Sequence, residues 1–315
     1  MKLGVIGAGA VGTAAVELAA EYGHAVTAFA DSETAVVDPT GIDRERALET
    51  KRTEGVVGSD DPESALRGPY DVLIEATPTT LGDARPGFGH VATALRRDRH
   101  VVLANKGPVA ERYGDLRDLE RQSDGTVLFE ATVDGAIPVL STIAGLGPRT
   151  ISGVHGVLNG IANFILSRMA AEGLDYEHVL AEAQELGVAE TDPSFDVDGT
   201  DAALKGVIVA NVLSNDEEYS LADASVTGIR EIPGAALELA QEDGQTVRLV
   251  AAVTDDGIDV GPRLVSEDSQ LAPSGTRNVV QLHSDIAGQL ELSGRGAGRR
   301  ETASSVFADI GRLSD

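Results

Sequence analysis

Glycines at a fixed spacing stand between a short apolar run and a helical pattern at the start of the chain. Residues 2–6 read as a strand, residues 7–12 read GAGAVG, and the helical pattern continues to residue 22. In such a turn Gly7 allows the tight bend, Gly9 lets the backbone approach a pyrophosphate, and Gly12 lets helix and strand pack closely. We therefore expect a Rossmann fold that binds a dinucleotide at the helix N-terminus, through a loop that comprises Gly7, Gly9, Ala10, Val11 and Gly12.

An acidic residue follows the next predicted strand, residues 24–30. Asp31 is placed where a carboxylate would accept hydrogen bonds from the adenosine ribose, although it could also simply cap a turn. Glu33 adds a second negative charge, and both would repel a 2′-phosphate, so the sequence favours NAD over NADP. The alternative stays open, because a nearby cation could accept that phosphate. The candidates are Arg44, Lys51 and Arg52.

Three further apolar runs, residues 72–76, 100–104 and 126–131, alternate with helical patterns. This rhythm is typical of a doubly wound α/β sheet, in which ligands gather beyond the carboxyl ends of the strands. Thr77, Asn105 and Lys106 stand at those ends and are candidate cofactor contacts. Lys106 is also a candidate active-site amine, the alternative being a solvated turn lysine.

The run VDGAIPVL, residues 133–140, departs from this rhythm and marks a domain boundary. We predict a dinucleotide-binding domain over residues 1–133, a second α+β domain over 134–293 and a C-terminal segment over 294–315. Short strand-like runs after residue 226 would complete the sheet of the second domain. Residues 294–299 are too rich in glycine to predict a regular element.

The acidic segment 190–205, ETDPSFDVDGTDAALK, precedes an apolar helical run and ends on a lysine. Asp201 and Lys205 are four residues apart and would share one face of a helix. The chain contains only four lysines, and a lysine, unlike an arginine, can exchange protons when it is desolvated. Lys205 is therefore a candidate acid/base. In the structural alternative, Asp198 or Thr200 caps the helix and Lys205 merely pairs with Asp201.

The chain is strongly acidic, with 51 Asp and Glu against 25 Lys and Arg and a formal net charge of −26. The acids form no long block, which favours a uniformly acidic surface of the kind expected in a very salty cytoplasm. A nucleic-acid partner is disfavoured. The absence of cysteine excludes disulfides, and no apolar run approaches the roughly 18 residues of a membrane span.

Several stretches together resemble the homoserine dehydrogenase family over almost the whole chain. They are GAGAVG, ANKGP (104–108), FEATVDGAIPVL (129–140), GVLNGIANFILSRM (156–169), LGVAETDPSFDVDGTDAALK (186–205) and GRGAGRRETASSV (294–306). The resemblance implies a Rossmann domain, a substrate domain whose sheet forms a homodimer, and a C-terminal segment that returns to the first domain. It also implies the short form, without the regulatory ACT domain of longer members.

The implied reaction is the NAD(P)-linked interconversion of L-homoserine and L-aspartate 4-semialdehyde in threonine and methionine biosynthesis. Lys205 and Lys106 match the two active-site lysines of the family. The resemblance assigns further positions to the substrate, to the cofactor and to a structural Na⁺ or K⁺. They are Glu190, Asp196, Asp201 and Gly160 for the substrate, Gly296 for the cofactor, and Glu130, Val133, Gly135 and Ile137 for the cation.

The chain departs from the family pattern at three positions near the expected substrate. Ile161 and Ala162 replace two threonines, and Val188 replaces a tyrosine. Loss of these hydroxyls leaves two alternatives open: a paralogous dehydrogenase of another small amino or hydroxy acid, and a dinucleotide-sensing protein without activity. The retained lysines disfavour the sensor, because sensing needs no proton-transfer amine.

Overall fold

The computed structural model describes residues 1–214 and 217–313, and the chain divides into two compact units. The first comprises Met1–Ala136 and the C-terminal segment from Ala297, and the second comprises Ile137–Gly296. Both boundaries lie three residues beyond the positions expected from the sequence. Within the described residues, no helix is both long and apolar enough to cross a bilayer.

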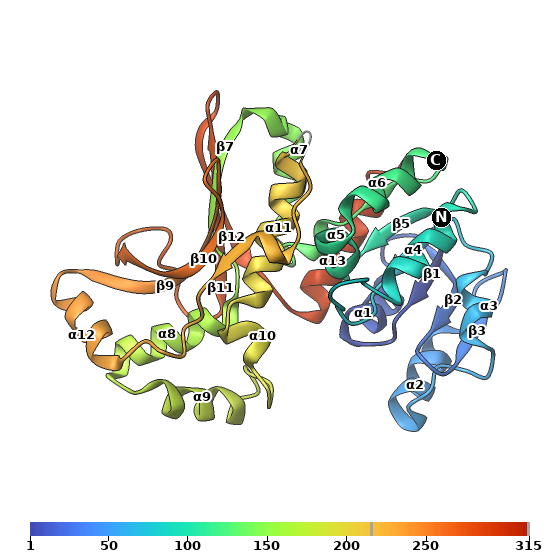
Figure 1. The fold of residues 1–315 in the computed structure, drawn as a ribbon. Coiled ribbons are helices and arrows are strands. Elements are labelled where there is room, and N and C mark those ends of the chain that lie inside the picture. The colour runs from blue at the N-terminus through green and yellow to red at the C-terminus, as the bar shows by residue number, and fades with distance from the viewer. Residues whose placement is uncertain (215–216, 314–315) are drawn as a thin grey trace. The chain divides into compact units, whose positions relative to one another are not determined.

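The first unit is built on a six-stranded sheet in the order β3-β2-β1-β4-β5-β6 (Figure 1). Its strands are β1 (Lys2–Ile6), β2 (Ala25–Ala30), β3 (Ala35–Val37), β4 (Val72–Glu75), β5 (His100–Leu103) and β6 (Val127–Leu128). All neighbours pair in parallel except β3, which runs antiparallel along β2. The order reverses between β1 and β4, and an α/β sheet binds its ligands beyond the carboxyl ends of the strands at such a point.

Helices cover this sheet, and the last of them comes from the C-terminal segment. They are α1 (Ala10–Leu18), α2 (Arg44–Glu54), α3 (Pro62–Leu66), α4 (Gly87–Leu95), α5 (Gly107–Glu111), α6 (Tyr113–Arg121), the 3₁₀ turn η1 (Glu130–Thr132) and α13 (Arg299–Ile310). Helix α13 packs against α1, with Arg299 2.6 Å from the Glu17 carboxylate and the Phe307 ring stacked on Tyr22 at 4.3 Å. The C-terminal helix therefore belongs to the core of the first unit.

The second unit contains a mixed six-stranded sheet in the order β12-β11-β7-β9-β10-β8. Its strands are β7 (Ile151–Val157), β8 (Ala224–Val226), β9 (Gln245–Thr254), β10 (Gly257–Ser266), β11 (Arg277–Ser284) and β12 (Gly288–Arg295). The expectation that residues 294–299 form no regular element is wrong for Gly294, Arg295 and Arg299. Gly294 and Arg295 belong to β12, because β11 offers backbone partners along the whole of that strand, and Arg299 begins α13.

The helices of the second unit are α7 (Val139–Leu146), α8 (Gly160–Glu172), α9 (Tyr176–Glu185), α10 (Ser194–Val197), α11 (Thr200–Leu213) and α12 (Gly234–Glu242), with the 3₁₀ turns η2 (Pro148–Thr150) and η3 (Leu221–Asp223). Helix α11 is buried on every side from Asp201 to Asn211. Small and apolar side chains allow this, so the one lysine of that helix lies inside the unit.

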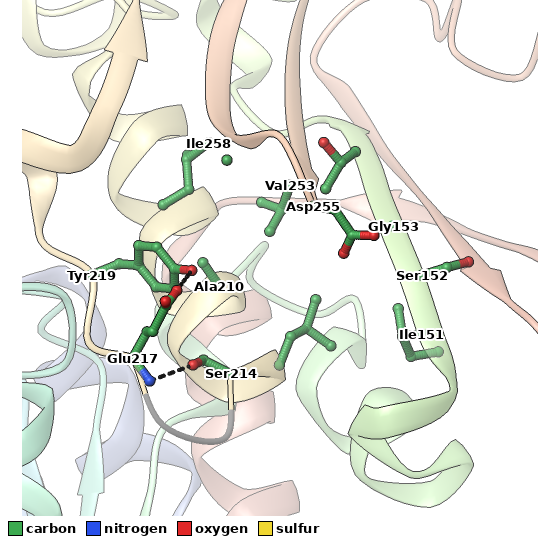
Figure 2. A pocket seen from close by; sticks show the side chains of 13 residues that line it. Ile151, Ser152, Gly153, Ala210, Ser214, Glu217, Tyr219, Val253, Asp255 and Ile258 are labelled. Atoms are coloured by element: carbon green, nitrogen blue, oxygen red, sulfur yellow. Dashed lines mark hydrogen bonds between the residues drawn. The ribbon is translucent and has the colours of Figure 1, made fainter.

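A pocket of about 280 Å³ opens between β7, the end of α11 and the β9–β10 hairpin (Figure 2). Figure 2 shows two polar contacts in its wall: the Tyr219 hydroxyl donates to the Glu217 carboxylate at 2.6 Å, and the Glu217 amide donates to the Ser214 hydroxyl at 2.9 Å. None of the site residues expected from the sequence lines this pocket. We therefore do not assign the substrate to it.

Candidate active site in two parts

The first unit contains a pocket of about 700 Å³ at the carboxyl ends of β1, β2 and β4. The glycine-rich loop lines one part of it, through Gly7, Gly9, Ala10 and Val11. Asp31 and Lys51 line another part, and Thr77 and His90 line a third. The pocket is mostly apolar with a few polar groups, as expected for a dinucleotide site.

Each of the three motif positions is glycine for a different structural reason. Gly7 has a φ of +107°, which disfavours any side chain. An added Cβ at Gly12 would overlap the carbonyl oxygen of Gly7, so Gly12 serves packing of the helix and does not line the pocket. A Cβ at Gly9 would meet nothing within 4 Å, which leaves open space where phosphates are expected.

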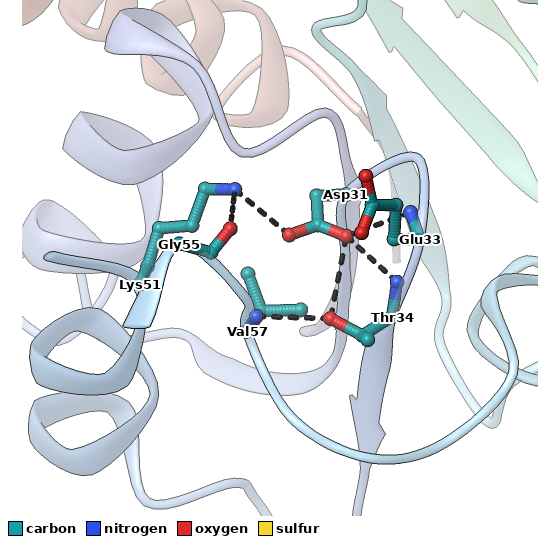
Figure 3. Close-up of polar contacts among 6 residues, drawn as sticks. All are labelled: Asp31, Glu33, Thr34, Lys51, Gly55 and Val57. Carbon is teal, nitrogen blue, oxygen red and sulfur yellow. Dashed lines mark hydrogen bonds and ion pairs between the residues drawn. The ribbon is translucent and has the colours of Figure 1, made fainter. Parts of the chain in front are cut away.

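Asp31 lies at the end of β2 in an ion pair with Lys51 (Figure 3). One carboxylate oxygen accepts from the Lys51 ammonium at 2.8 Å, and the other accepts from the amides of Glu33 and Thr34 at 2.9 and 2.7 Å. Burial alone would raise the pKa of Asp31, but these hydrogen bonds and the lysine charge lower it below its usual range. Lys51 also donates to the carbonyl of Gly55 at 2.6 Å. Asp31, the residue predicted to bind the ribose, therefore has its negative charge balanced by Lys51 within the pocket wall.

The two other candidate cations make different contacts. Arg44 donates to the carbonyls of Val16 and Glu17 at 3.1 and 3.2 Å. Arg52 forms an exposed ion pair with Glu49 at 2.7 Å. Of the three cations considered for a 2′-phosphate, Lys51 is the one that lines the pocket.

Thr77, Asn105 and Lys106 follow β4 and β5, as the strand pattern predicted. Thr77 lines the pocket, whereas Asn105 is 1% exposed and donates to the Thr77 hydroxyl at 3.2 Å. Asn105 therefore orients Thr77 in this structure. Lys106 precedes α5, and its amide donates to the Thr79 hydroxyl at 3.4 Å.

A buried carboxylate in this region was missed from the sequence. Glu75, the last residue of β4, is fully buried and accepts a short hydrogen bond from the Thr77 hydroxyl. The His90 ring nitrogen lies 3.3 Å from the same carboxylate oxygen, and the second oxygen has no partner among the described residues. Its position at the carboxyl end of an otherwise apolar parallel strand is the sequence signal from which Glu75 could have been predicted.

In the second unit, Asn159 connects two carboxylates of the acidic segment. Its side-chain NH₂ donates to Asp196 at 2.7 Å and to Asp201 at 3.0 Å, and its oxygen accepts from the amide of Ala162 at 2.9 Å. Asn159 thus caps α8 and holds the two acids together. Neither role was predicted from the sequence.

Lys205 is buried, with 5% of its surface exposed. Its ammonium lies 2.9 Å from Asp201 and also donates to the carbonyl of Leu158. The structural alternative, in which Asp198 or Thr200 caps the helix, is wrong about the cap: Gly199, with a φ of +89°, precedes the helix, and no side chain among the described residues caps it. A left-handed glycine here lets the chain turn sharply from α10 into α11.

The remaining acids of the segment make separate contacts. Glu190 is exposed, Asp192 accepts from the amide of Ser194 at 3.1 Å, and Asp198 pairs with Arg230. Burial raises the pKa of Asp196; the hydrogen bond from Asn159 opposes this, and the charges of Asp201 and Glu190 add to it. The structure therefore brings Asp196, Asp201 and Lys205 together around Asn159, with Glu190 near enough to affect Asp196.

Two glycines assigned by resemblance are explained by packing in this structure. A Cβ at Gly160 would lie 2.7 Å from the carbonyl oxygen of Thr276. At Gly296 it would overlap the Asn278 side chain. Both positions require close approach of the backbone, which does not exclude a ligand contact.

The positions expected to hold a monovalent cation are also buried. Glu130 is 3% exposed, Val133 is fully buried, and the Gly135 carbonyl accepts from the Ser305 hydroxyl. Ile137, the first residue of the second unit, is 3% exposed. Among the described residues, no group of three or more His, Asp or Glu side chains is arranged to hold a metal, so a cation here would depend on Glu130 and backbone carbonyls.

The three departures from the family pattern differ in burial. Ile161 and Val188 are half-buried, whereas Ala162 is fully buried and its amide donates to Asn159. A hydroxyl at position 162 would therefore point into the packed interior or toward Asn159. Position 161 is the one of the α8 pair at which a side chain reaches the surface of the unit.

Two protein-family models match parts of this chain. A model described as homoserine dehydrogenase matches residues 138–310, more than half of the chain. A model described as glutamate/leucine/phenylalanine/valine dehydrogenase matches residues 1–70, which contain the glycine-rich turn and Asp31. The first match covers the acidic segment, Lys205 and most of the second unit.

Known proteins are similar over most of the chain. A putative homoserine dehydrogenase from Archaeoglobus fulgidus is 40% identical, with a TM-score of 0.91 over 99% of this chain and 98% of that one. A hyperthermophilic archaeal homoserine dehydrogenase in complex with NADPH is 29% identical, with a TM-score of 0.85 over 99% and 96%. An NAD(+)-dependent homoserine dehydrogenase of Pseudomonas canavaninivorans is 38% identical over 247 residues, 76% of this chain and 70% of that protein. The chain therefore belongs to the homoserine dehydrogenase family.

Proposed function

We propose that the protein catalyses the NAD(P)-linked interconversion of L-homoserine and L-aspartate 4-semialdehyde. The observation that carries the proposal is the buried Lys205 ammonium, held by Asp201 and the Leu158 carbonyl beside the Asn159–Asp196 hydrogen bond. In such an arrangement the buried amine can carry a proton, and the neighbouring carboxylates can bind a substrate ammonium. Family membership supports the same reaction.

In this mechanism Lys205 exchanges the proton of the substrate oxygen. In the oxidation direction its neutral amine accepts the hydroxyl proton, and in the reduction direction its ammonium, stabilised by Asp201, donates a proton to the aldehyde oxygen. Asp196 and Glu190 hold the substrate ammonium. A bound nicotinamide supplies the hydride acceptor or donor. Lys106, as the second active-site lysine, orients the substrate.

We assign the dinucleotide to the pocket that the glycine-rich loop lines, with NAD preferred over NADP. Asp31 would accept hydrogen bonds from the ribose, and its pairing with Lys51 engages the one pocket cation that could receive a 2′-phosphate. The preference therefore depends on both members of the pair: without Asp31, the Lys51 ammonium becomes available to a phosphate. Thr77 contacts the cofactor farther along the pocket.

A monovalent cation such as Na⁺ or K⁺ fits the buried acid of the first unit. Glu130 is nearly inaccessible, and a second buried carboxylate, Asp309, accepts from the Glu130 amide at 2.7 Å. Asp309 also pairs with Arg312 at 3.1 Å, so a bound cation would compensate the charge of Glu130. Glu130 with the carbonyls of Val133, Gly135 and Ile137 would hold it, in a structural role.

The setting we propose is a homodimer in a salty cytoplasm, acting in threonine and methionine biosynthesis. The net charge of −26 supports a cytoplasm of high salt concentration, because screening at high ionic strength weakens the repulsion among exposed acids. The sheet of the second unit ends at β12, an eight-residue edge strand. Such an edge, together with the sheet face beside it, offers a surface for a second copy.

The substrate assignment is tested against the paralogue alternative by comparing amino and hydroxy acids at equal concentration. Homoserine should give the highest kcat/KM, and Ile161→Thr should lower its KM if the missing hydroxyl weakens binding. Ala181→Thr, at an exposed position of α9, is the matched control and should leave the KM unchanged. Faster turnover of another small acid than of homoserine would move the assignment to the paralogue.

A further inference from the structure

A buried arginine of the second unit has an incomplete set of partners. Arg248 on β9 is 7% exposed. One terminal nitrogen donates to the Thr246 hydroxyl at 2.7 Å and to the Val247 carbonyl at 2.8 Å. Among the described residues, its Nε has no acceptor and no carboxylate forms an ion pair with it. The guanidinium therefore keeps its charge without a close ion pair, and the Glu267 carboxylate acts on it from a longer distance.

Such an arrangement is unfavourable unless something compensates it, because burial removes water from a charged group. Burial lowers the pKa of Arg248, and the negative charge of Glu267 opposes this effect. Arg263, directly opposite on β10, adds a second positive charge, although it is exposed and pairs with Asp259. Asp259 therefore balances the charge of Arg263, and the buried Arg248 is the group that favours a bound anion.

A pocket of about 180 Å³ lies beside Arg248. Figure 1 shows α8, α12 and β9, three of the elements that form it, at one end of the second unit. The Ser167 hydroxyl of α8 also lines it and is buried without a partner among the described residues. Gln241 of α12 and Glu267 after β10 complete the polar lining. Two unsatisfied polar groups of different elements thus belong to one small pocket.

We propose that this pocket binds a small α-amino acid through its carboxylate, at a site distinct from Lys205. The carboxylate oxygens accept from Arg248 and Ser167, which satisfies both buried donors. The ammonium of the same molecule faces the Glu267 carboxylate. The volume admits a few non-hydrogen atoms and excludes a nucleotide. None of the residues assigned to homoserine or the dinucleotide lines the pocket.

The test is a calorimetric titration of the full chain at constant salt with glycine, acetate and ethanolamine. We expect saturable binding of glycine, weaker binding of acetate, which lacks the ammonium, and none of ethanolamine, which lacks the carboxylate. Glycine binding should persist in the Asp196→Asn variant, because Asp196 does not line this pocket. Absence of glycine binding, or its loss in Asp196→Asn, would overturn the proposal.

Variants locate the site. Arg248→Gln should weaken glycine binding by about 10- to 100-fold, the usual effect of losing a charged hydrogen bond. Arg263→Gln is the matched control, since that arginine is directly opposite but does not line the pocket, and it should bind as the unmodified chain does. If Arg248→Gln does not fold, Ser167→Ala decides, because it removes one donor and keeps the charge. Unchanged affinity in the folded variant contradicts the proposal.

Discussion

The ammonium of Lys205 lies 2.9 Å from the carboxylate of Asp201, one turn earlier on the same buried helix. Both groups are desolvated, so each depends on the other for compensation of its charge. The pair explains why an otherwise small and apolar helix contains a lysine.

Replacing Lys205 by methionine should lower turnover about 100- to 10,000-fold, the range typical of a lost general acid/base. Dinucleotide binding, measured by fluorescence titration, should stay unchanged, because the cofactor pocket belongs to the first unit. Stability should fall by about 3–5 kcal/mol, since the buried Asp201 carboxylate loses the Lys205 charge and keeps the weaker hydrogen bond from Asn159.

The matched control for that variant is Lys2→Met, which removes an exposed lysine whose ammonium donates to the Pro39 carbonyl. It should keep near-normal rates. Comparable losses in both variants would show that removal of any lysine harms the protein, and Lys205 would then not be the proton carrier.

Replacing Asp31 by serine should release Lys51 toward a 2′-phosphate. We expect the ratio of kcat/KM for NADP to that for NAD to rise at least about 10-fold, which corresponds to about 1.4 kcal/mol. Steady-state rates with both cofactors measure it. Asp38→Ser is the control, because Asp38 accepts from Thr40 in an exposed turn and lies outside the pocket lining. An unchanged ratio in Asp31→Ser would remove this pair from cofactor selection.

The glycine-rich turn allows a comparison of two similar substitutions. Gly12→Ala should destabilise the chain by about 3 kcal/mol, because its Cβ would overlap the backbone of Gly7. Gly9→Ala should change stability by less than about 1 kcal/mol, since its Cβ meets open space, but weaken cofactor binding at least about 10-fold. Thermal unfolding and dinucleotide titration separate the two. Equal stability of the variants would contradict the packing role of Gly12.

His155 on β7 should contribute to loss of stability in acid. Burial and the facing ring of His283, 5.1 Å away, lower its pKa below the ordinary value of 6.5. Between those two values the unfolded chain binds more protons than the folded chain. Stability is therefore retained above about pH 6.5 and decreases as the pH falls from there through the folded-state pKa.

His155→Gln should flatten the pH dependence of the free energy of unfolding between about pH 7 and 5. Denaturant unfolding at several pH values measures it. His178→Gln, at an exposed position on α9, serves as control and should leave the curve unchanged. The same slope in His155→Gln as in the unmodified chain would rule out this contribution.

The sequence predicted the parts of the fold that depend on local pattern. The glycine turn and the apolar runs of β1, β2, β4 and β5 fall where the spacing indicated, because strand period and glycine chemistry are local properties. Strand β12 was misjudged at Gly294 and Arg295, since pairing with β11 is a long-range property that no local pattern contains.

The candidate site was also predictable only where it depends on local spacing. The helical spacing of Asp201 and Lys205 indicated their ion pair. The bridge from Asn159 to Asp196 joins residues 37 positions apart, and the pairing of Lys51 with Asp31 joins residues 20 apart, so neither follows from spacing. Glu75 was missed because an acid at the end of a strand is expected to be exposed to solvent, and its burial is known only from the structure.

The assigned reaction is tested most directly by absorbance at the nicotinamide band with L-homoserine and NAD, then NADP, near molar potassium chloride. We expect turnover with both cofactors, faster with NAD, and loss of that turnover in Lys205→Met. No turnover with either cofactor, in protein shown to be folded and to bind dinucleotide, would contradict the assigned reaction.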